Sequence, residues 1–186
     1  MSIIQGVIAS ISKGGATPPP PGFEPIDSSV SLGLSWTVET VCDLSPTTFW
    51  ATMWGNEVWN SALGHLAYLS STTYLTVGSP NGGNEYNLAQ DVSVKSYWAF
   101  THTDGGGLDV YRNGVLLTPS ATSYVQPPGI SPNNTLLWGA RHNNDGTGTT
   151  DTIGSGNYYW TNISPDVKSA LDIATTYDAT RGTYGI

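Results

Sequence analysis

The sequence predicts an all-β protein, an antiparallel β-sandwich or jelly roll with one short helix near its C-terminal end. Many short segments alternate apolar and polar residues, and clusters rich in Gly, Pro and Asn separate them. The dipeptide Asn113-Gly114 is a strong signal for a tight hairpin. Charged residues are only 11% of the 186 residues, so the surface consists mainly of neutral polar groups, as is typical of strands and turns.

The N-terminal 27 residues stand apart from the predicted sandwich. Residues 17–27 form a Pro-rich linker, in which Pro18–Pro21 favour a stiff, extended polyproline II conformation. Before it, residues 1–16 form an apolar segment whose periodicity fits a helical stripe and a strand face equally well. Exposure of apolar side chains to water is unfavourable, so we expect this segment to anchor the chain to a partner. The partner is either copies of the segment itself in a homo-oligomer or a larger particle. The predicted anchoring residues are Ile3, Ile4, Val7, Ile8 and Ile11.

Residues 28–186 are predicted to form one β-sandwich domain. Its core is expected to contain Trp36, Trp98 and Trp138, which alternate with small or polar neighbours. The lone Cys42 is expected to be a small buried hydrophobe. The predicted strands cover residues 29–44, 47–54, 64–70, 73–78, 95–103, 108–114, 115–119, 135–142 and 157–163.

The hairpin around Asn113-Gly114 has a predictable register. Pairing outward from the turn places Arg112 opposite Val115 and Tyr111 opposite Leu116. One face is mixed and could meet solvent, a second layer or a ligand. The opposite face carries the apolar residues Leu108, Val110, Val115 and Leu117.

One segment, residues 164–182, has the pattern of a helix. Ser164 suits the N-cap and Pro165 suits the first turn. The apolar stripe expected to face the sandwich is Val167, Ala170, Leu171 and Ala174.

Charge and hydropathy exclude two classes of partner. The formal net charge is −8, and the six Lys and Arg residues are scattered, so nucleic acid is not an expected ligand. No apolar run approaches the roughly 20 residues of a membrane-spanning helix. The first residues lack the pattern of a signal peptide, so we expect synthesis in a cytoplasm.

Aromatic residues are the main candidates for a ligand site. The chain has seven Trp and ten Tyr, and exposed Trp and Tyr side chains stack on sugars or anchor interfaces. Neighbouring aromatics on one strand cannot all point inward. The candidate ligand-binding residues are Trp54, Glu57, Trp59, Tyr158 and Tyr159.

The segment 143–154 partly matches a calcium-binding loop. Asp145 and Asp151 fall at ligand positions, whereas Gly154 stands where a bidentate glutamate is expected. Asp145 and Asp151 are therefore candidate calcium ligands, with a plain Asx-rich turn as the alternative. No other cofactor is predicted.

The residues do not support catalysis. Glycoside hydrolysis needs two carboxylates flanking a cleft, and none of the four glutamates has a second carboxylate two residues away. The three histidines lack a metal-ligand spacing, and no G-x-S-x-G motif is present. We therefore expect no enzymatic activity.

The segments "YWAFTHTDGGGLDVYRNGVLL", "TLLWGARHNNDGTG" and "ISPDVKSALDIA" follow one another in an order that resembles the laminin-G-like, concanavalin A-like lectin/glucanase superfamily. The apolar N-terminal segment with its Pro-rich linker resembles the N-termini of tailed-phage virion proteins. Together these resemblances imply a virion structural or decoration protein, bound to capsid or tail proteins by its N-terminal arm and displaying a concanavalin A-like sandwich on the virion surface. The alternative that they imply is a carbohydrate- or receptor-binding module of a tail fibre or spike, with a cell-surface glycan as partner, and a glycan-cleaving enzyme comes third.

Overall fold

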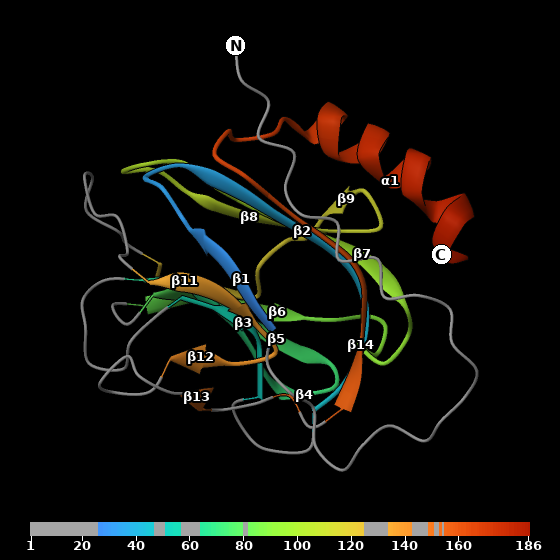
Figure 1. The fold of residues 1–186 in the computed structure, drawn as a ribbon, viewed down its shortest axis with the longest axis horizontal. Helices are drawn as coiled ribbons and strands as arrows, with labels where there is room; N and C mark the ends of the chain where they lie inside the picture. Colours follow the sequence, from blue (N-terminus) through green and yellow to red (C-terminus); the bar gives the residue numbers. More distant parts are fainter. Residues whose placement is uncertain are drawn as a thin grey trace.

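The computed structural model describes residues 26–46, 51–56, 64–79, 82–124, 134–142, 149–150, 153 and 155–186. Within these residues, two antiparallel β-sheets pack face to face, and α1 (Ala170–Tyr184) lies on the outer face of one of them (Figure 1). The predicted β-sandwich with one C-terminal helix is therefore confirmed. No helix in the described part of the chain is long and apolar enough to cross a membrane.

The larger sheet has seven strands and is called here the seven-stranded sheet. Its spatial order is β1 (Ile26–Ser31), β11 (Thr135–Trp138), β3 (Ala51–Gly55), β4 (Leu66–Ser71), β5 (Tyr74–Ser79), β6 (Gly82–Asn87) and β10 (Ala121–Thr122). A separate two-stranded ribbon joins β12 (Arg141–His142) to β13 (Thr149–Thr150). Strand β1 begins before the predicted domain boundary at residue 28.

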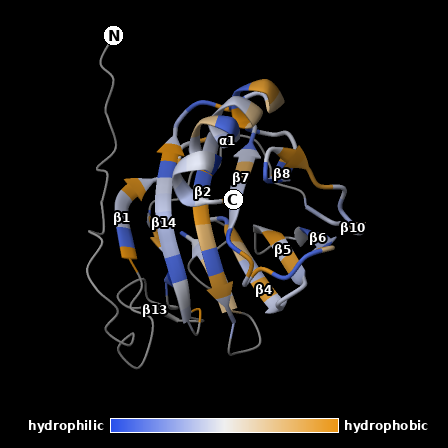
Figure 2. Cartoon of the chain, turned by 90° about the vertical axis from the view of Figure 1, so that its right-hand side faces the viewer, coloured by the Kyte–Doolittle hydropathy of each residue, from blue (hydrophilic) through white to orange (hydrophobic). Residues whose placement is uncertain are grey.

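The second sheet, called here the five-stranded sheet, carries the helix. Its spatial order is β14 (Ser155–Ser164), β2 (Trp36–Ser45), β7 (Ser96–His102), β8 (Leu108–Arg112) and β9 (Val115–Leu116). Residues of β2 are buried on both faces, because one face meets the seven-stranded sheet and the other lies beneath α1 (Figure 2). The continuous strand predicted for residues 29–44 is wrong, because the chain leaves one sheet after β1 and enters the other at β2, with Leu34 exposed between them.

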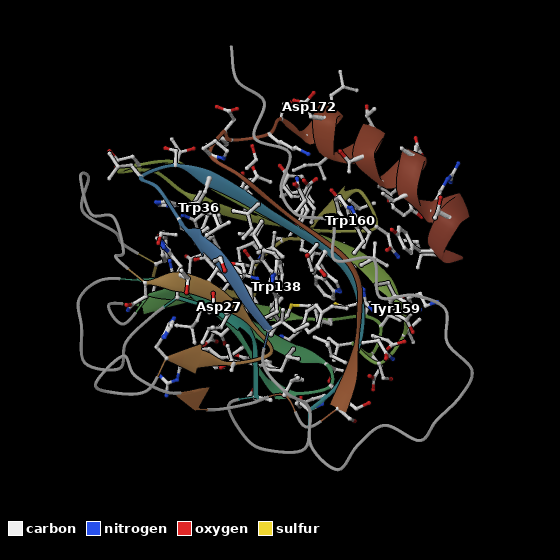
Figure 3. All side chains as sticks on the ribbon, in the orientation of Figure 1. Asp27, Trp36, Trp138, Tyr159, Trp160 and Asp172 are labelled. Carbon is white, nitrogen blue, oxygen red and sulfur yellow. The ribbon has the colours of Figure 1, made fainter. Side chains whose placement is uncertain are left out.

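Aromatic side chains fill the space between the sheets. The rings of Trp36 and Trp54 meet edge to face at a centroid distance of 5.5 Å, and Phe100 lies 5.2 Å from Trp54. Trp36, Trp98 and Trp138 are all buried, as predicted, and two of them are labelled in Figure 3. Cys42 is buried beside them, and this burial raises the pKa of its thiol, so the prediction of a buried small hydrophobe is confirmed.

The predicted hairpin is confirmed in its turn and its register. Asn113 and Gly114 have φ of 50° and 77°, as a type I′ turn requires. Tyr111 pairs with Leu116, and Arg112 pairs with Val115. The mixed face meets a second layer, because Tyr111 packs in the cluster beneath α1. Val115, on the apolar face of the hairpin, is 66% exposed, because β9 is the edge strand of its sheet.

The helix begins later than predicted. Its N-cap is Ser169, which accepts a hydrogen bond from the Asp172 backbone while the Asp172 carboxylate accepts one from the Ser169 backbone. Ser164 instead accepts from the backbone N of Asp166, before the helix. The predicted stripe is also wrong: Leu171 is 76% exposed, and the buried helix residue is Ile173, with Tyr177 packed beside it.

Strand β6 begins with Gly82-Gly83-Asn84, which belong to one of the Gly-, Pro- and Asn-rich clusters that the sequence analysis placed between strands. The glycines are required by the close approach of β5 and β6. A Cβ atom on Gly78 would lie 2.3 Å from the carbonyl oxygen of Gly82. Here glycine serves strand pairing, a use that a turn-based interpretation of Gly-rich segments does not anticipate.

Candidate functional site

A pocket of about 330 Å³ lies beside the crossover by which the chain passes from β9 in the five-stranded sheet to β10 in the seven-stranded sheet. Its walls come from both sheets and from the loop after β6. The lining residues are Tyr86, Asn87, Leu88, Ala89, Gln90, Arg112, Asn113, Leu117 and Thr118.

The pocket combines apolar surface with a polar rim. Tyr86 and Leu88 are buried residues of the core, and burial raises the pKa of Tyr86 to about 12, so its phenol stays neutral. Asn87, Gln90 and Thr118 are exposed, and their side chains make no hydrogen bond to any described residue. Two amides and one hydroxyl are therefore available to a ligand.

Arg112, at the end of β8, provides a buried cation in the pocket wall; it is 8% exposed. Its Nε atom donates to Ser96 Oγ at 3.1 Å, and its Nη2 atom donates to the Asp91 carbonyl at 2.7 Å. Its Nη1 atom donates to the Gln90 carbonyl, and the guanidinium lies 4.7 Å from the ring centroid of Trp98. Arg112 thus joins the loop after β6 to the hairpin and to the core.

Among the described residues, all hydrogen-bond partners of the Arg112 guanidinium are neutral. They are backbone carbonyl oxygens and the hydroxyl of Ser96, and no described carboxylate forms an ion pair with it. Burial lowers the pKa of Arg112, a shift that the nearby Asp91 opposes. Arginine nevertheless remains protonated in proteins, so the pocket wall keeps a positive charge.

Backbone hydrogen bonds hold the pocket walls in place. On the loop after β6, Leu88 N donates to Thr73 O and Val92 N donates to Thr72 O, both at 2.8 Å. At the hairpin, Asn113 N donates to the carbonyl oxygen of Tyr97 at 2.8 Å, and the Asn113 side chain accepts from Tyr97 N at 2.9 Å. The pocket is therefore formed before any ligand arrives.

A second polar cluster lies inside the sandwich. Tyr124 Oη lies 2.9 Å from His65 Nε2 and 3.2 Å from His102 Nδ1, and the two imidazole rings are 4.7 Å apart. Trp36 packs against both rings. Burial lowers the pKa of His102, although the Gly107 backbone and Asp104 oppose this shift. Both histidines are fully buried, so this cluster does not offer a surface for a macromolecular ligand.

The aromatic candidates from the sequence lie in different environments. Trp54 is fully buried, and Tyr158 is buried with its hydroxyl donating to the carbonyl oxygen of Met53, so neither forms a ligand-binding surface. Tyr159 is 37% exposed, and its hydroxyl donates to Asp43 Oδ2 at 2.6 Å. Desolvation is the largest cause and this hydrogen bond the next largest, and together they raise the pKa of Tyr159 to about 12.

A register shift between Tyr158 and Trp160 explains these different environments. It inserts Tyr159 as an extra residue, so that Tyr158 faces the core. Trp160 instead packs in the cluster beneath α1 (Figure 3). Lys95 Nζ lies 4.2 Å from the Tyr159 ring centroid. Tyr159 is therefore the described aromatic candidate at the surface, and it lies away from the pocket lining.

The remaining candidates fall outside the described residues. These are Glu57 and Trp59 of the ligand prediction, Asp145 and Asp151 of the calcium prediction, and the anchoring residues Ile3, Ile4, Val7, Ile8 and Ile11. Their roles stay predictions. Within the described residues, no group of three or more His, Cys, Asp or Glu side chains could hold a metal ion.

The sequence analysis did not identify Arg112, Gln90 or Thr118 as site residues. One signal was present, because Arg112 continues the core-facing alternation of Leu108 and Val110. A cation at a core-facing position needs partners, and it often marks a functional or structural network. Gln90 and Thr118 carried no comparable signal, since neutral polar residues in loops are ordinary.

The fold is similar to that of several solved carbohydrate-related structures. The CBM40 domain of the Ruminococcus gnavus IT-sialidase, bound to α2,3-sialyllactose, matches with a TM-score of 0.57 and 13% identity over 77% of this chain and 82% of that chain. Trypanosoma rangeli sialidase matches with a TM-score of 0.57 and 9% identity over 77% of this chain and 22% of that chain. No protein-family model and no curated protein matches the chain.

A structure of botulinum neurotoxin type C, whose cell entry depends on two ganglioside molecules, matches with a TM-score of 0.54 and 12% identity. The match covers 80% of this chain and 36% of that chain. At these identities the likeness shows the fold alone, an antiparallel β-sandwich, and the predicted fold class is confirmed.

Proposed function

We propose that this protein is a non-catalytic carbohydrate-binding module and that the pocket beside Arg112 is its glycan site. The observation that carries the proposal is the composition of this pocket. It has apolar surface from Tyr86 and Leu88, and a rim of polar side chains free of hydrogen bonds to the described residues.

Sugars present both apolar C–H patches and hydroxyl groups. An apolar wall accepts the C–H patches, whereas amides and hydroxyls such as those of Asn87, Gln90 and Thr118 exchange hydrogen bonds with the hydroxyl groups. Because backbone hydrogen bonds fix the loop and the hairpin, binding requires little ordering of the protein.

The fold comparisons support the same proposal. One similar structure holds sialyllactose, and another belongs to a toxin that depends on gangliosides. In the sequence analysis, carbohydrate binding is the alternative to a virion structural role. The fold comparisons support carbohydrate binding better than they support the structural role.

The lining of the pocket argues for binding rather than cleavage. The described residues of the lining include no carboxylate and no imidazole, whereas glycoside hydrolysis requires two carboxyl groups beside the scissile bond. The two described glutamates are engaged elsewhere: Glu39 accepts from Lys168, and Glu85 accepts from the hydroxyl of Tyr74.

We propose in addition that the module is displayed on a virion, anchored to capsid or tail proteins through residues 1–16. This part rests on the sequence alone, namely on the apolar N-terminal segment and the Pro-rich linker that follows it. A carbohydrate-binding module at the end of such an arm would attach the particle to a cell-surface glycan.

A glycan array with the full chain tests the binding proposal, and Thr118→Trp provides the blocking variant, because Thr118 is an exposed rim residue. We expect the wild-type chain to bind a subset of glycans and the Thr118→Trp chain to lose them. Ser31→Trp is the matched control, because Ser31 is exposed on β1, at the opposite edge of the seven-stranded sheet. Binding that survives Thr118→Trp, or no binding to any glycan, would contradict the proposal.

A further inference from the structure

We infer that the pocket selects glycans that carry a carboxylate, and that the Arg112 guanidinium is the group that recognises it. This inference rests on the proposed function, because it names the class of glycan that the same site takes. The ligand chemistry is an acidic sugar, and the carboxylate could belong to a nonulosonic acid or to a uronic acid.

The first argument is the hydrogen-bond inventory of Arg112. A guanidinium has five N–H groups. The Nε and Nη2 groups donate to Ser96 Oγ and to the Asp91 carbonyl, and one Nη1 group donates to the Gln90 carbonyl. The second N–H of Nη1 has no acceptor among the described residues, and Arg112 lines the pocket.

The second argument is the charge balance. A buried cation is costly unless an anion pairs with it, and carbonyl and hydroxyl oxygens do not neutralise its charge. The Asp91 carboxylate interacts with the guanidinium through its charge, but Arg112 donates to the backbone carbonyl of Asp91, and the carboxylate accepts from the backbone N of Ser93 at 2.8 Å. Among the described residues no carboxylate accepts directly from the guanidinium, and a ligand carboxylate would do so through a charge-assisted hydrogen bond.

The third argument is the absence of competing charge in the pocket. Its lining contains Arg112 as the one charged residue among the described residues, and the rim side chains are neutral. The chain as a whole has a net charge of −8, which repels anions at long range. Selection of an acidic sugar must therefore come from this local positive site, at contact distance.

The test measures the affinity of the full chain for three probes by calorimetric titration: lactose, α2,3-sialyllactose and a linear galacturonic acid trisaccharide. We expect at least one acidic probe to bind about tenfold or more tightly than lactose, as a charged hydrogen bond provides. The acidic probe that binds identifies the source of the carboxylate.

Because Arg112→Lys removes bonds that hold a loop and could unfold the chain, the decisive variant is Gln90→Glu. Gln90 is exposed, and its replacement places a carboxylate on the rim beside Arg112. We expect acidic-probe affinity to fall about tenfold in this variant. Ser31→Glu adds the same charge on β1, at the opposite edge of the seven-stranded sheet, and should change affinity less than twofold.

The inference and the proposed function fail in different ways. Equal affinity for lactose and both acidic probes, or equal effects of Gln90→Glu and Ser31→Glu, would overturn the inference and assign Arg112 to holding the loop alone. Glycan-array binding to neutral glycans only, blocked by Thr118→Trp, would overturn the inference while leaving the carbohydrate-binding function intact. No binding to any probe or array glycan would overturn both.

Discussion

Lys168 Nζ lies 2.6 Å from Glu39 Oε2, and the Glu39 side chain is fully buried between the five-stranded sheet and the segment that leads into α1. The same carboxylate accepts from the Tyr97 hydroxyl at 2.6 Å and from the Asn162 amide at 2.8 Å. Three donors from different parts of the chain thus surround one buried anion. The ion pair between Lys168 and Glu39 holds the segment that precedes α1 against the outer face of the five-stranded sheet.

Replacement of Lys168 by Met should destabilise the protein by about 3 kcal/mol, because it leaves the buried Glu39 charge without its cation. Chemical denaturation followed by circular dichroism measures the effect. The double variant Lys168→Met with Glu39→Gln should recover part of the loss, since it removes the unpaired charge. A single-variant loss below about 0.5 kcal/mol would show that the pair does not stabilise the fold.

Stability should begin to fall as the pH decreases below 6.5. Burial holds the pKa of His102 in the folded chain below its ordinary value of 6.5, so between the folded-state pKa and pH 6.5 the unfolded chain binds more protons than the folded one. The stabilisation is complete above 6.5 and is lost as the pH falls towards the folded-state pKa. The pKa values of Asp91 and Asp172 are lowered from 3.8, so these two groups reduce stability only when the pH falls to about 3.8 and below. They do not contribute to the loss that begins just below pH 6.5.

Urea midpoints measured across this pH range test the prediction. The variant His102→Gln keeps a side chain that hydrogen-bonds Tyr124 and removes one titrating group, so its midpoints should depend less on pH. Identical pH profiles for the wild-type and variant chains would contradict the role of His102.

Replacement of Gly114 by Val should destabilise the protein by at least about 1 kcal/mol, because a β-branched residue resists a positive φ. A Cβ atom at this position would also lie 3.1 Å from the Tyr177 ring of α1. Gly107→Ala is the control, since its Cβ would meet no atom within 4 Å. A midpoint for Gly114→Val equal to that of the control would refute the turn assignment.

The local features of the fold could be predicted from the sequence. The hairpin register follows from two adjacent residues, Asn113 and Gly114, and the buried Trp36, Trp98 and Trp138 follow from strand alternation. The helix was predicted in the right place, but its start was not. Ser164 and Ser169 both suit an N-cap, and the reciprocal bonds with Asp172 decide in favour of Ser169.

The candidate site could not be predicted, because its parts come together only in the folded chain. Tyr86 lies on β6 and Arg112 on β8, in different sheets, and the crossover after β9 closes the pocket between them. His65 and His102 are likewise far apart in sequence, and strand packing brings their rings together. Rules based on residue spacing detect sites formed by one continuous segment, such as metal-binding loops. The pocket and the His65–His102 cluster are each formed by segments that are distant in the sequence, so such rules do not detect them.

Deletion of residues 1–16 should leave the sandwich folded and its thermal midpoint unchanged, because β1 begins at Ile26. If this segment anchors the chain, the deletion should also abolish the oligomer or the incorporation into a particle, measured by light scattering and co-sedimentation. Replacement of Ile3, Ile4, Val7, Ile8 and Ile11 by Ser should have the same effect at full length. A truncated chain that assembles as well as the intact one would contradict the anchoring prediction.

The most direct test of the central claim is a map of backbone amide chemical shifts during titration of the full chain with the best-binding glycan. The glycan site proposed here predicts that the largest shift changes fall on residues 87–90, 112–113 and 117–118, around the Arg112 guanidinium. Shift changes concentrated instead around Tyr159 on β14, with none at the pocket, would contradict the account and assign glycan binding to the outer face of the five-stranded sheet.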